Sequence, residues 1–163
     1  MKKRLAGMKR IVAVLLSVLM LMTMLCGCNN GAVISEEEAQ TPILTVDQYT
    51  VTLDEVYLYY LQYIFNNNLM PSQVTEASTQ TITTYVVQQI QMEYVQYQLA
   101  MASEITLTEE NMLAAENSAN AFYNHFGEEF LSMYSIDYDM VYNMFVRTMY
   151  INELSEKAMQ DLA

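Results

Sequence analysis

The sequence predicts a mainly α-helical domain in which a short N-terminal strand or hairpin precedes a bundle of about four helices. Glycine and proline are scarce, with four and two in 163 residues, which disfavours an all-β sandwich. Apolar residues recur at helical spacing in four stretches after residue 52. Only residues 43–51 are rich in side chains that favour extended structure.

The first 27 residues have the pattern of a secretory signal. Five basic residues precede a 15-residue apolar run, residues 11–25, whereas a spanning helix needs about 20. Leu25-Cys26-Gly27-Cys28 resembles the lipobox of bacterial lipoproteins. The resemblance implies that Cys28 is acylated and becomes the mature N-terminus, and two or more acyl chains anchor a protein stably. The alternatives are an uncleaved signal anchor and an ordinary secreted protein.

We therefore expect a signal peptide at 1–27, a lipidated acidic tether at 28–41 and a helical domain at 42–163, held at the outer face of the cell membrane. Cleavage before Cys28 would leave two basic residues, Arg147 and Lys157, against 19 acidic ones. This imbalance disfavours nucleic acid and anionic lipid head groups as ligands, and it could attract basic segments of other proteins. Its simplest interpretation is a solvated acidic surface.

The residues offer little for catalysis or metal binding. Beyond Cys28 no cysteine remains for a disulfide or a thiolate ligand, and His125 is the only histidine. The acidic pairs Glu109-Glu110 and Glu128-Glu129 fall at predicted helix starts, where adjacent side chains diverge by about 100°. No nucleophile triad, phosphate loop or metal spacing is present. We expect no cofactor, no metal and no catalytic residue in this chain.

Each element has its own start and stop signals. The acidic stretch 29–41 is expected to be a flexible tether, and Asp47-Gln48 offers a turn within 43–51 that would make either a hairpin or a single edge strand. Thr52 to Glu55 fits a capping box before the first helix. The second helix is expected from Thr79 to Ala102, with Val87, Val95 and Leu99 widening its apolar face. The apolar stripes of these two helices are Leu53, Val56, Tyr57, Tyr60, Leu61, Ile64 and Ile82, Val86, Ile90, Tyr94, Tyr97, Met101.

Two more long helices complete the predicted bundle. Thr108 is the expected N-cap of the third, and Gly127 fits the position just after its end. A short helix could follow at 128–134, and Asp137 is expected to cap the last helix. The buried stripe expected on the third helix is Met112, Ala115, Ala119, Phe122 and Phe126. One face of the last helix is shared by Met140, Met144, Ile151, Leu154, Ala158 and Leu162.

In order and spacing, these elements resemble the N-terminal chaperone domain of SurA/PrsA-type extracytoplasmic foldases, which are parvulin-family peptidylprolyl isomerases. Val46-Asp47-Gln48 stands where that family often has an Asn/Asp-Gly turn. Thr52 to Glu55 matches its capping element, and Ile105 to Glu110 matches the connector after its long helix. The resemblance covers about residues 43–160. The family's isomerase domain has no counterpart here, so the chain would be either a chaperone-only member or a fragment of a longer foldase.

Tyrosine and methionine suggest how such a domain could hold clients. The chain has 13 tyrosines, 14 methionines and no tryptophan, and both residue types suit adaptable apolar binding surfaces. We expect Tyr57 and Tyr60 in the core, and we select Tyr59, Tyr63, Tyr97 and Met101 as candidate polypeptide-binding residues. Partners would be unfolded or nascent secreted proteins, with a homodimer as a further possibility.

Three functions remain open from the sequence. The first is a membrane-anchored holdase for unfolded secreted polypeptides. The second is the N-terminal part of a peptidylprolyl isomerase whose parvulin domain lies outside this chain. The third is a structural or regulatory lipoprotein with the same fold.

Overall fold

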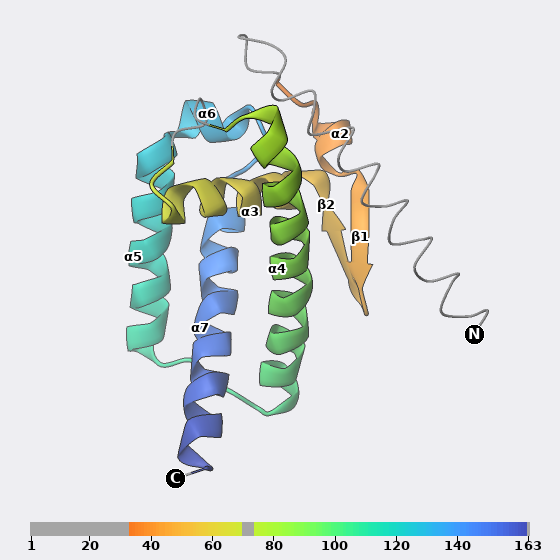
Figure 1. Cartoon of the computed structure of the whole chain (residues 1–163). Helices are drawn as coiled ribbons and strands as arrows, with labels where there is room; N and C mark the ends of the chain where they lie inside the picture. Colours follow the sequence, from red (N-terminus) through yellow and green to blue (C-terminus); the bar gives the residue numbers. More distant parts are fainter. Residues whose placement is uncertain (1–32, 70–73, 163) are drawn as a thin grey trace, which may run out of the picture. The chain divides into compact units, whose positions relative to one another are not determined.

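The computed structural model describes residues 33–69 and 74–162, and it is mainly helical with one small hairpin (Figure 1). This confirms the predicted fold class. The described residues divide into two compact units, one ending at Gln88 and the other beginning at Gln89, with the boundary inside a long helix. Each unit is described by itself below. The predicted signal peptide and Cys28 lie outside the described residues.

The first unit begins with a helical turn inside the predicted tether. Helix α2 (Glu36–Ala39) starts at a capping box in which Ser35 Oγ accepts from the Glu38 amide and the Glu38 carboxylate accepts from the Ser35 amide. Ala39 is fully buried. The expectation of a structureless tether is therefore wrong for residues 36–39. The run of acidic residues suggested a solvated segment, but Ser35 and Glu38 form a Ser-x-x-Glu pattern that encodes a short capped helix.

The hairpin consists of β1 (Pro42–Val46) and β2 (Tyr49–Thr52), which pair antiparallel (Figure 1). Leu44 lies opposite Val51, and the register is irregular between Pro42 and Leu44. Asp47 takes a positive φ of 52° at the predicted turn, a conformation that aspartate tolerates better than most residues. Of the two predicted alternatives, the hairpin is confirmed.

The start of helix α3 (Leu53–Asn66) differs from its prediction. Thr52 is the N-cap but makes no side-chain cap hydrogen bond. Instead its hydroxyl donates to Asp54, whose carboxylate also accepts from the Glu55 amide at 2.7 Å and from Gln40 Nε2 at 2.7 Å. The predicted Thr52–Glu55 capping box is wrong because Asp54, only 2% exposed, takes these donors and ties α3 to the residue after α2.

Helix α3 is buried on almost every side. Besides the predicted stripe, Leu58 and Tyr59 are nearly or fully inaccessible, while Tyr60 is half-buried. A helix that is apolar all round belongs in an interior. The hairpin and the first part of helix α4 (Glu76–Ala102) add the other buried apolar residues of this unit, Ile43, Leu44, Val46, Val51, Ile82, Val86 and Val87.

The second unit contains the rest of α4, α5 (Glu109–Phe126), α6 (Glu128–Ser132) and α7 (Tyr138–Gln160) (Figure 1). Contacts from α4 to α7 advance together along both helices, from Glu93–Arg147 to Ser103–Lys157, so these two helices run parallel. Contacts from α5 to α7 advance in opposite directions, with Asn111 bound to Glu153 and Tyr123 beside Tyr138. Helix α7 therefore packs against both of the others.

The predicted caps of this unit are confirmed. Thr108 Oγ1 accepts from the Asn111 amide, and the Asn111 side chain accepts from the Thr108 amide. Asp137 Oδ1 accepts from the Met140 amide at 2.8 Å. Gly127 ends α5 with φ 82° and ψ 149°, a region essentially restricted to glycine.

The predicted stripes of this unit are only partly buried. Its buried residues on α5, α6 and α7 include Ala115, Ala119, Phe122, Leu131, Val141 and Met144. The centroid of the Phe122 ring lies 5.0 Å from that of Phe126 and 6.2 Å from that of Phe145. The buried stripe predicted for α5 is wrong at Met112, which is 38% exposed. The shared apolar face of the last helix is open toward its end, where Ala158 is exposed and Leu162 is 88% exposed. Helical spacing continued there beyond the length of α7 that the neighbouring helices cover.

Candidate polypeptide-binding surface

The predicted binding residues fall into different environments. Tyr59 has no exposed surface, so its selection as a client-binding residue is wrong, and its ring is part of the interior instead. Tyr63 is half-buried and meets Tyr85 edge-on at 5.2 Å between ring centroids. Tyr57, expected in the core, is 3% exposed, which confirms that expectation.

The two candidates on the second unit lie on one side of α4. Tyr97 is half-buried and meets Tyr150 of α7 edge-on at 5.5 Å, so most of its ring serves helix packing. Met101 is 48% exposed. Tyr97 and Met101 do not adjoin the exposed Met92. Around the helix axis, they lie about 140° and about 180° from it.

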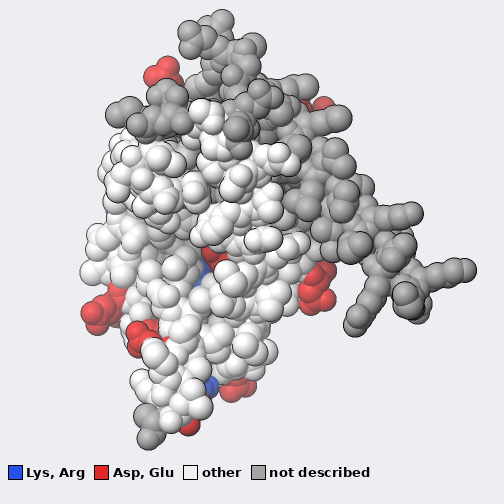
Figure 2. Space-filling view, viewed as in Figure 1, with Lys and Arg blue, Asp and Glu red and all other residues white. Residues whose placement is uncertain are grey.

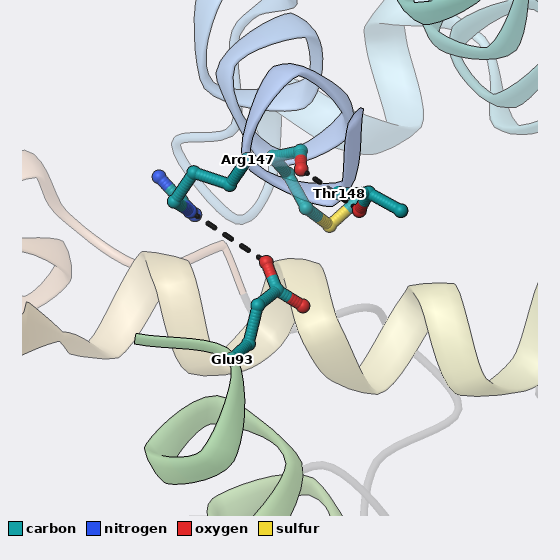
Figure 3. Close-up of polar contacts among 4 residues, drawn as sticks. Glu93, Arg147 and Thr148 are labelled. Atoms are coloured by element: carbon teal, nitrogen blue, oxygen red, sulfur yellow. Dashed lines mark hydrogen bonds and ion pairs between the residues drawn. The ribbon is translucent and has the colours of Figure 1, made fainter. Parts of the chain in front are cut away.

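A charged pair fixes the inner face of α4 in this unit (Figure 3). Arg147 extends from α7 toward Glu93, with its Nε 3.6 Å from Glu93 Oε1. The guanidinium carbon also lies 4.9 Å from the centre of the Tyr94 ring, within the range of a cation–π contact. The Glu93 and Arg147 side chains are only 10% and 15% exposed. This arrangement joins two helices and offers no open site for a substrate.

The opposite face of α4 carries exposed apolar side chains. Met92, Val95 and Leu99 are 59%, 55% and 55% exposed, and their spacing of three and four residues places them on one face. Glu93, Tyr94 and Tyr97, which contact α7, lie on the other side of the helix. We call Met92, Val95 and Leu99 the outer face of α4.

The outer face has no charged neighbour on its own helix. Between residues 89 and 102 the only charged residue is the buried Glu93, and the polar positions are glutamines such as the exposed Gln91. Figure 2 shows one side of the molecule, where acidic side chains lie mainly around the margins of the described surface and a red and a blue patch lie near its centre. An apolar segment can cover the outer face of α4 without stripping water from an exposed charge on residues 89–102.

The first unit has a separate shallow hollow. It has a volume of about 420 Å³ and is lined by five residues along α4, Gln80, Thr81, Thr84, Tyr85 and Gln88. Tyr85 is 51% exposed, and Tyr63 supports its ring. The lining contains hydroxyl and amide groups but no acid or base suited to catalysis near neutral pH.

The perturbed ionisable groups of the described residues include Glu38, whose pKa is lowered by hydrogen bonds from Ser35, and several tyrosines whose environments favour the neutral phenol. Burial raises the pKa of Tyr134 above its usual value. Burial also raises the pKa of Tyr123 and of Tyr138, whose ring centroids lie 5.5 Å apart. The negative charges of Glu128 and Asp137 raise the pKa of Tyr123 further, and that of Glu116 raises the pKa of Tyr138. None of these phenols is poised to act as a base near pH 7.

Within residues 33–69 and 74–162, no three His, Cys, Asp or Glu side chains gather as a metal site would require. The helices described there are also too short or too polar to cross a bilayer.

The outer face and the charged pair do not follow from the predicted stripes. Val95 and Leu99 widen the apolar face of the predicted helix, but the structure leaves them more than half exposed beside Met92. The available signal was that α4 carries two apolar stripes, one through Ile90 and Tyr94 and another through Met92 and Leu99. For the charged pair, the signal was that Arg147 is one of two basic residues after the predicted cleavage site.

Comparison of the chain with family models, with curated proteins and with solved structures found no match.

Proposed function

We propose that this protein is an extracytoplasmic holdase, anchored to the membrane through Cys28, that binds unfolded secreted polypeptides on the outer face of α4. The observation that carries the proposal is the exposure of Met92, Val95 and Leu99 on the side of α4 opposite its contacts with α7. The lipobox-like residues 25–28 and the foldase-like order of elements support the location and the class of partner.

The size of the outer face favours transient binding. Fully burying a Val, Leu or Met side chain contributes about 1.5–3 kcal/mol, so covering the exposed half of three such side chains contributes about 2–4 kcal/mol. A dissociation constant near 1 mM corresponds to about 4 kcal/mol. A contact of this strength suits repeated capture and release of a client, whereas a permanent complex needs a larger interface.

Membrane anchoring would strengthen such a weak contact. Copies held on one membrane surface could engage several apolar segments of the same unfolded chain, and each further contact becomes effectively intramolecular. The proposed anchor and the weak outer face are therefore consistent parts of one mechanism. The chain's own residues supply binding and release only, and no covalent step is assigned to them.

The experiment measures light scattering by a reduced, unfolded model client with the soluble chain 29–163 at physiological salt. The test variant is M92Q/V95T/L99Q. The matched control is M159Q/V33T/L113Q, which makes the same three replacements at side chains that are 64%, 69% and 57% exposed elsewhere. Circular dichroism establishes that each variant is folded.

Because a contact with a dissociation constant near ~1 mM is occupied only at high concentration, we expect the unmodified chain and the control variant to suppress aggregation in large molar excess over the client, and the test variant to lose most of that effect. Equal suppression by both variants would reject the outer face as the binding site. No suppression by a folded unmodified chain would reject the holdase function altogether.

A further inference from the structure

Charge points to the kind of polypeptide that the outer face accepts. Resting on the proposed function, we infer that the preferred occupant is an extended, unfolded segment in which a few apolar residues are followed or preceded by lysine or arginine. A second copy of this chain and an acidic segment are the competing occupants, and the experiment below distinguishes them.

The second unit is strongly anionic. Residues 89–163 contain twelve acidic residues and two basic ones, Arg147 and Lys157. Arg147 pairs with Glu93 in the interior, and the Lys157 ammonium donates to the Ser103 carbonyl at 3.2 Å. Because both cations already have partners within the unit, most of the exposed acids face solvent with no cation of this unit opposite them.

Several of these acids lie at the end of the unit where the outer face ends. The Lys157–Ser103 and Asn111–Glu153 bonds bring the end of α4, the start of α5 and the end of α7 together. The exposed acidic residues at this end are Glu104, Glu109, Glu110, Glu156 and Asp161. We call them the acidic end. Leu99 lies within one turn of the end of α4, so the outer face ends close to the acidic end.

An extended peptide bound on the outer face is long enough to reach the acidic end. From Met92 to Leu99 the helix rises about 10 Å, which an extended segment covers with about three residues. The next few residues of a longer segment then reach past the end of α4. Exposed charges interact across about 10 Å at 0.1 M salt, so cationic residues at those positions would be attracted to the acidic end.

The same charges argue against a second copy as the occupant. Pairing two outer faces would bring two units together that each carry twelve acids and two bases, and like charges oppose such an approach. The three side chains of the outer face also provide far less than the roughly 800 Å² per partner of a typical stable interface. An acidic client segment would meet the same repulsion.

The test uses fluorescence anisotropy with two labelled peptides that share one apolar triplet and differ only in carrying four lysines or four glutamates. Binding to the soluble chain 29–163 is measured at low salt and at about 0.5 M salt. We expect the lysine peptide to bind about tenfold or more tightly at low salt and the preference to shrink markedly at high salt.

Two charge variants locate the effect. E104Q/E156Q/D161N removes charge from the acidic end, and E128Q/E129Q/D139N removes the same number of charges at the other end of α5 and α7. We expect the first to reduce the lysine preference several-fold and the second to retain most of it. Thermal unfolding confirms that both variants are folded.

Equal binding of the two peptides, preference for the glutamate peptide, or equal effects of the two charge variants would overturn the inference. Self-association in sedimentation that M92Q/V95T/L99Q abolishes would assign the outer face to a second copy and would also overturn it. The aggregation assay tests the proposed function independently of the peptide assay. If the chain suppresses aggregation but binds the lysine and glutamate peptides equally, the charge inference is rejected and the holdase function is retained.

Discussion

Removing one member of the Glu93–Arg147 pair should destabilise the protein more than replacing both. In E93Q, the Arg147 guanidinium keeps its charge in a largely buried position but loses the carboxylate 3.6 Å away. In R147M, the Glu93 carboxylate loses its cation. In E93Q/R147M neither charge remains, and the methionine still packs beside the Tyr94 ring that the guanidinium approaches at 4.9 Å.

The expected magnitudes follow from burial and distance. Breaking a fully buried ion pair by removing one partner costs about 3–5 kcal/mol, because a charge stays buried without compensation. Here the two side chains keep 10% and 15% of their exposure, and the Nε–Oε1 distance exceeds that of a hydrogen bond. We therefore expect each single variant to lose about 2–4 kcal/mol and the double variant to lose less than the larger of the two.

Urea unfolding followed by circular dichroism measures these values, and equal slopes with denaturant ensure that the unfolding transition is the same in all variants. The double-mutant cycle then isolates the interaction between the two positions. Single-variant losses below about 0.5 kcal/mol, a range typical of surface substitutions, would refute the reasoning. Losses that simply add in the double variant would refute it as well.

Other predictions concern single positions. Y59A should cost about 3–5 kcal/mol in urea unfolding, because Tyr59 has no exposed surface, whereas the half-buried Tyr63 should cost clearly less as Y63A; similar losses would contradict the burial argument. T108A should lower stability by about 1 kcal/mol in thermal unfolding, since it removes the acceptor for the Asn111 amide. G127A should cost about 1–3 kcal/mol through backbone strain at φ 82° alone, because a Cβ there meets nothing within 4 Å; a neutral result would refute the strained geometry. Burial raises the pKa of Tyr134 above 10.0, so its folded state holds the proton longer than the unfolded state does. The resulting stabilisation is complete below pH 10 and is lost as the pH rises through the folded pKa; ultraviolet titration of the phenols in Y134F against the unmodified chain checks this.

Local signals predicted the helical elements well because each depends on a few neighbouring residues. Thr108, Gly127 and Asp137 end or start helices through their own backbone and side-chain chemistry, and the structure confirms all three. The prediction of a capping box at Thr52 was wrong because a competing acceptor, Asp54, lies two residues away and is held in a buried position by a hydrogen bond from Gln40. That outcome depends on a contact across 14 residues, which a local pattern does not contain.

The candidate surface was harder to predict because periodicity identifies apolar faces but not their coverage. Tyr59 sits outside the predicted stripe of α3 yet is fully buried, and Val95 and Leu99 have core-like chemistry yet are more than half exposed. Burial depends on how many neighbours surround a helix. Helix α3 is covered on nearly all sides, whereas the second part of α4 contacts α7 with one side and leaves another open.

The charged pair explains how a helix with two apolar stripes settles on one orientation. If α4 turned its outer face toward α7, Glu93 would rotate away from Arg147, and the guanidinium would remain beside Met92 or Val95 without its carboxylate. Such a state would bear the cost of a buried, uncompensated charge. Burial alone distinguishes the stripes poorly, because Met92, Val95 and Leu99 are about as apolar as Ile90, Tyr94 and Tyr97. We infer that Glu93 and Arg147 contribute orientation more than net stability, and that they thereby keep the outer face of α4 exposed.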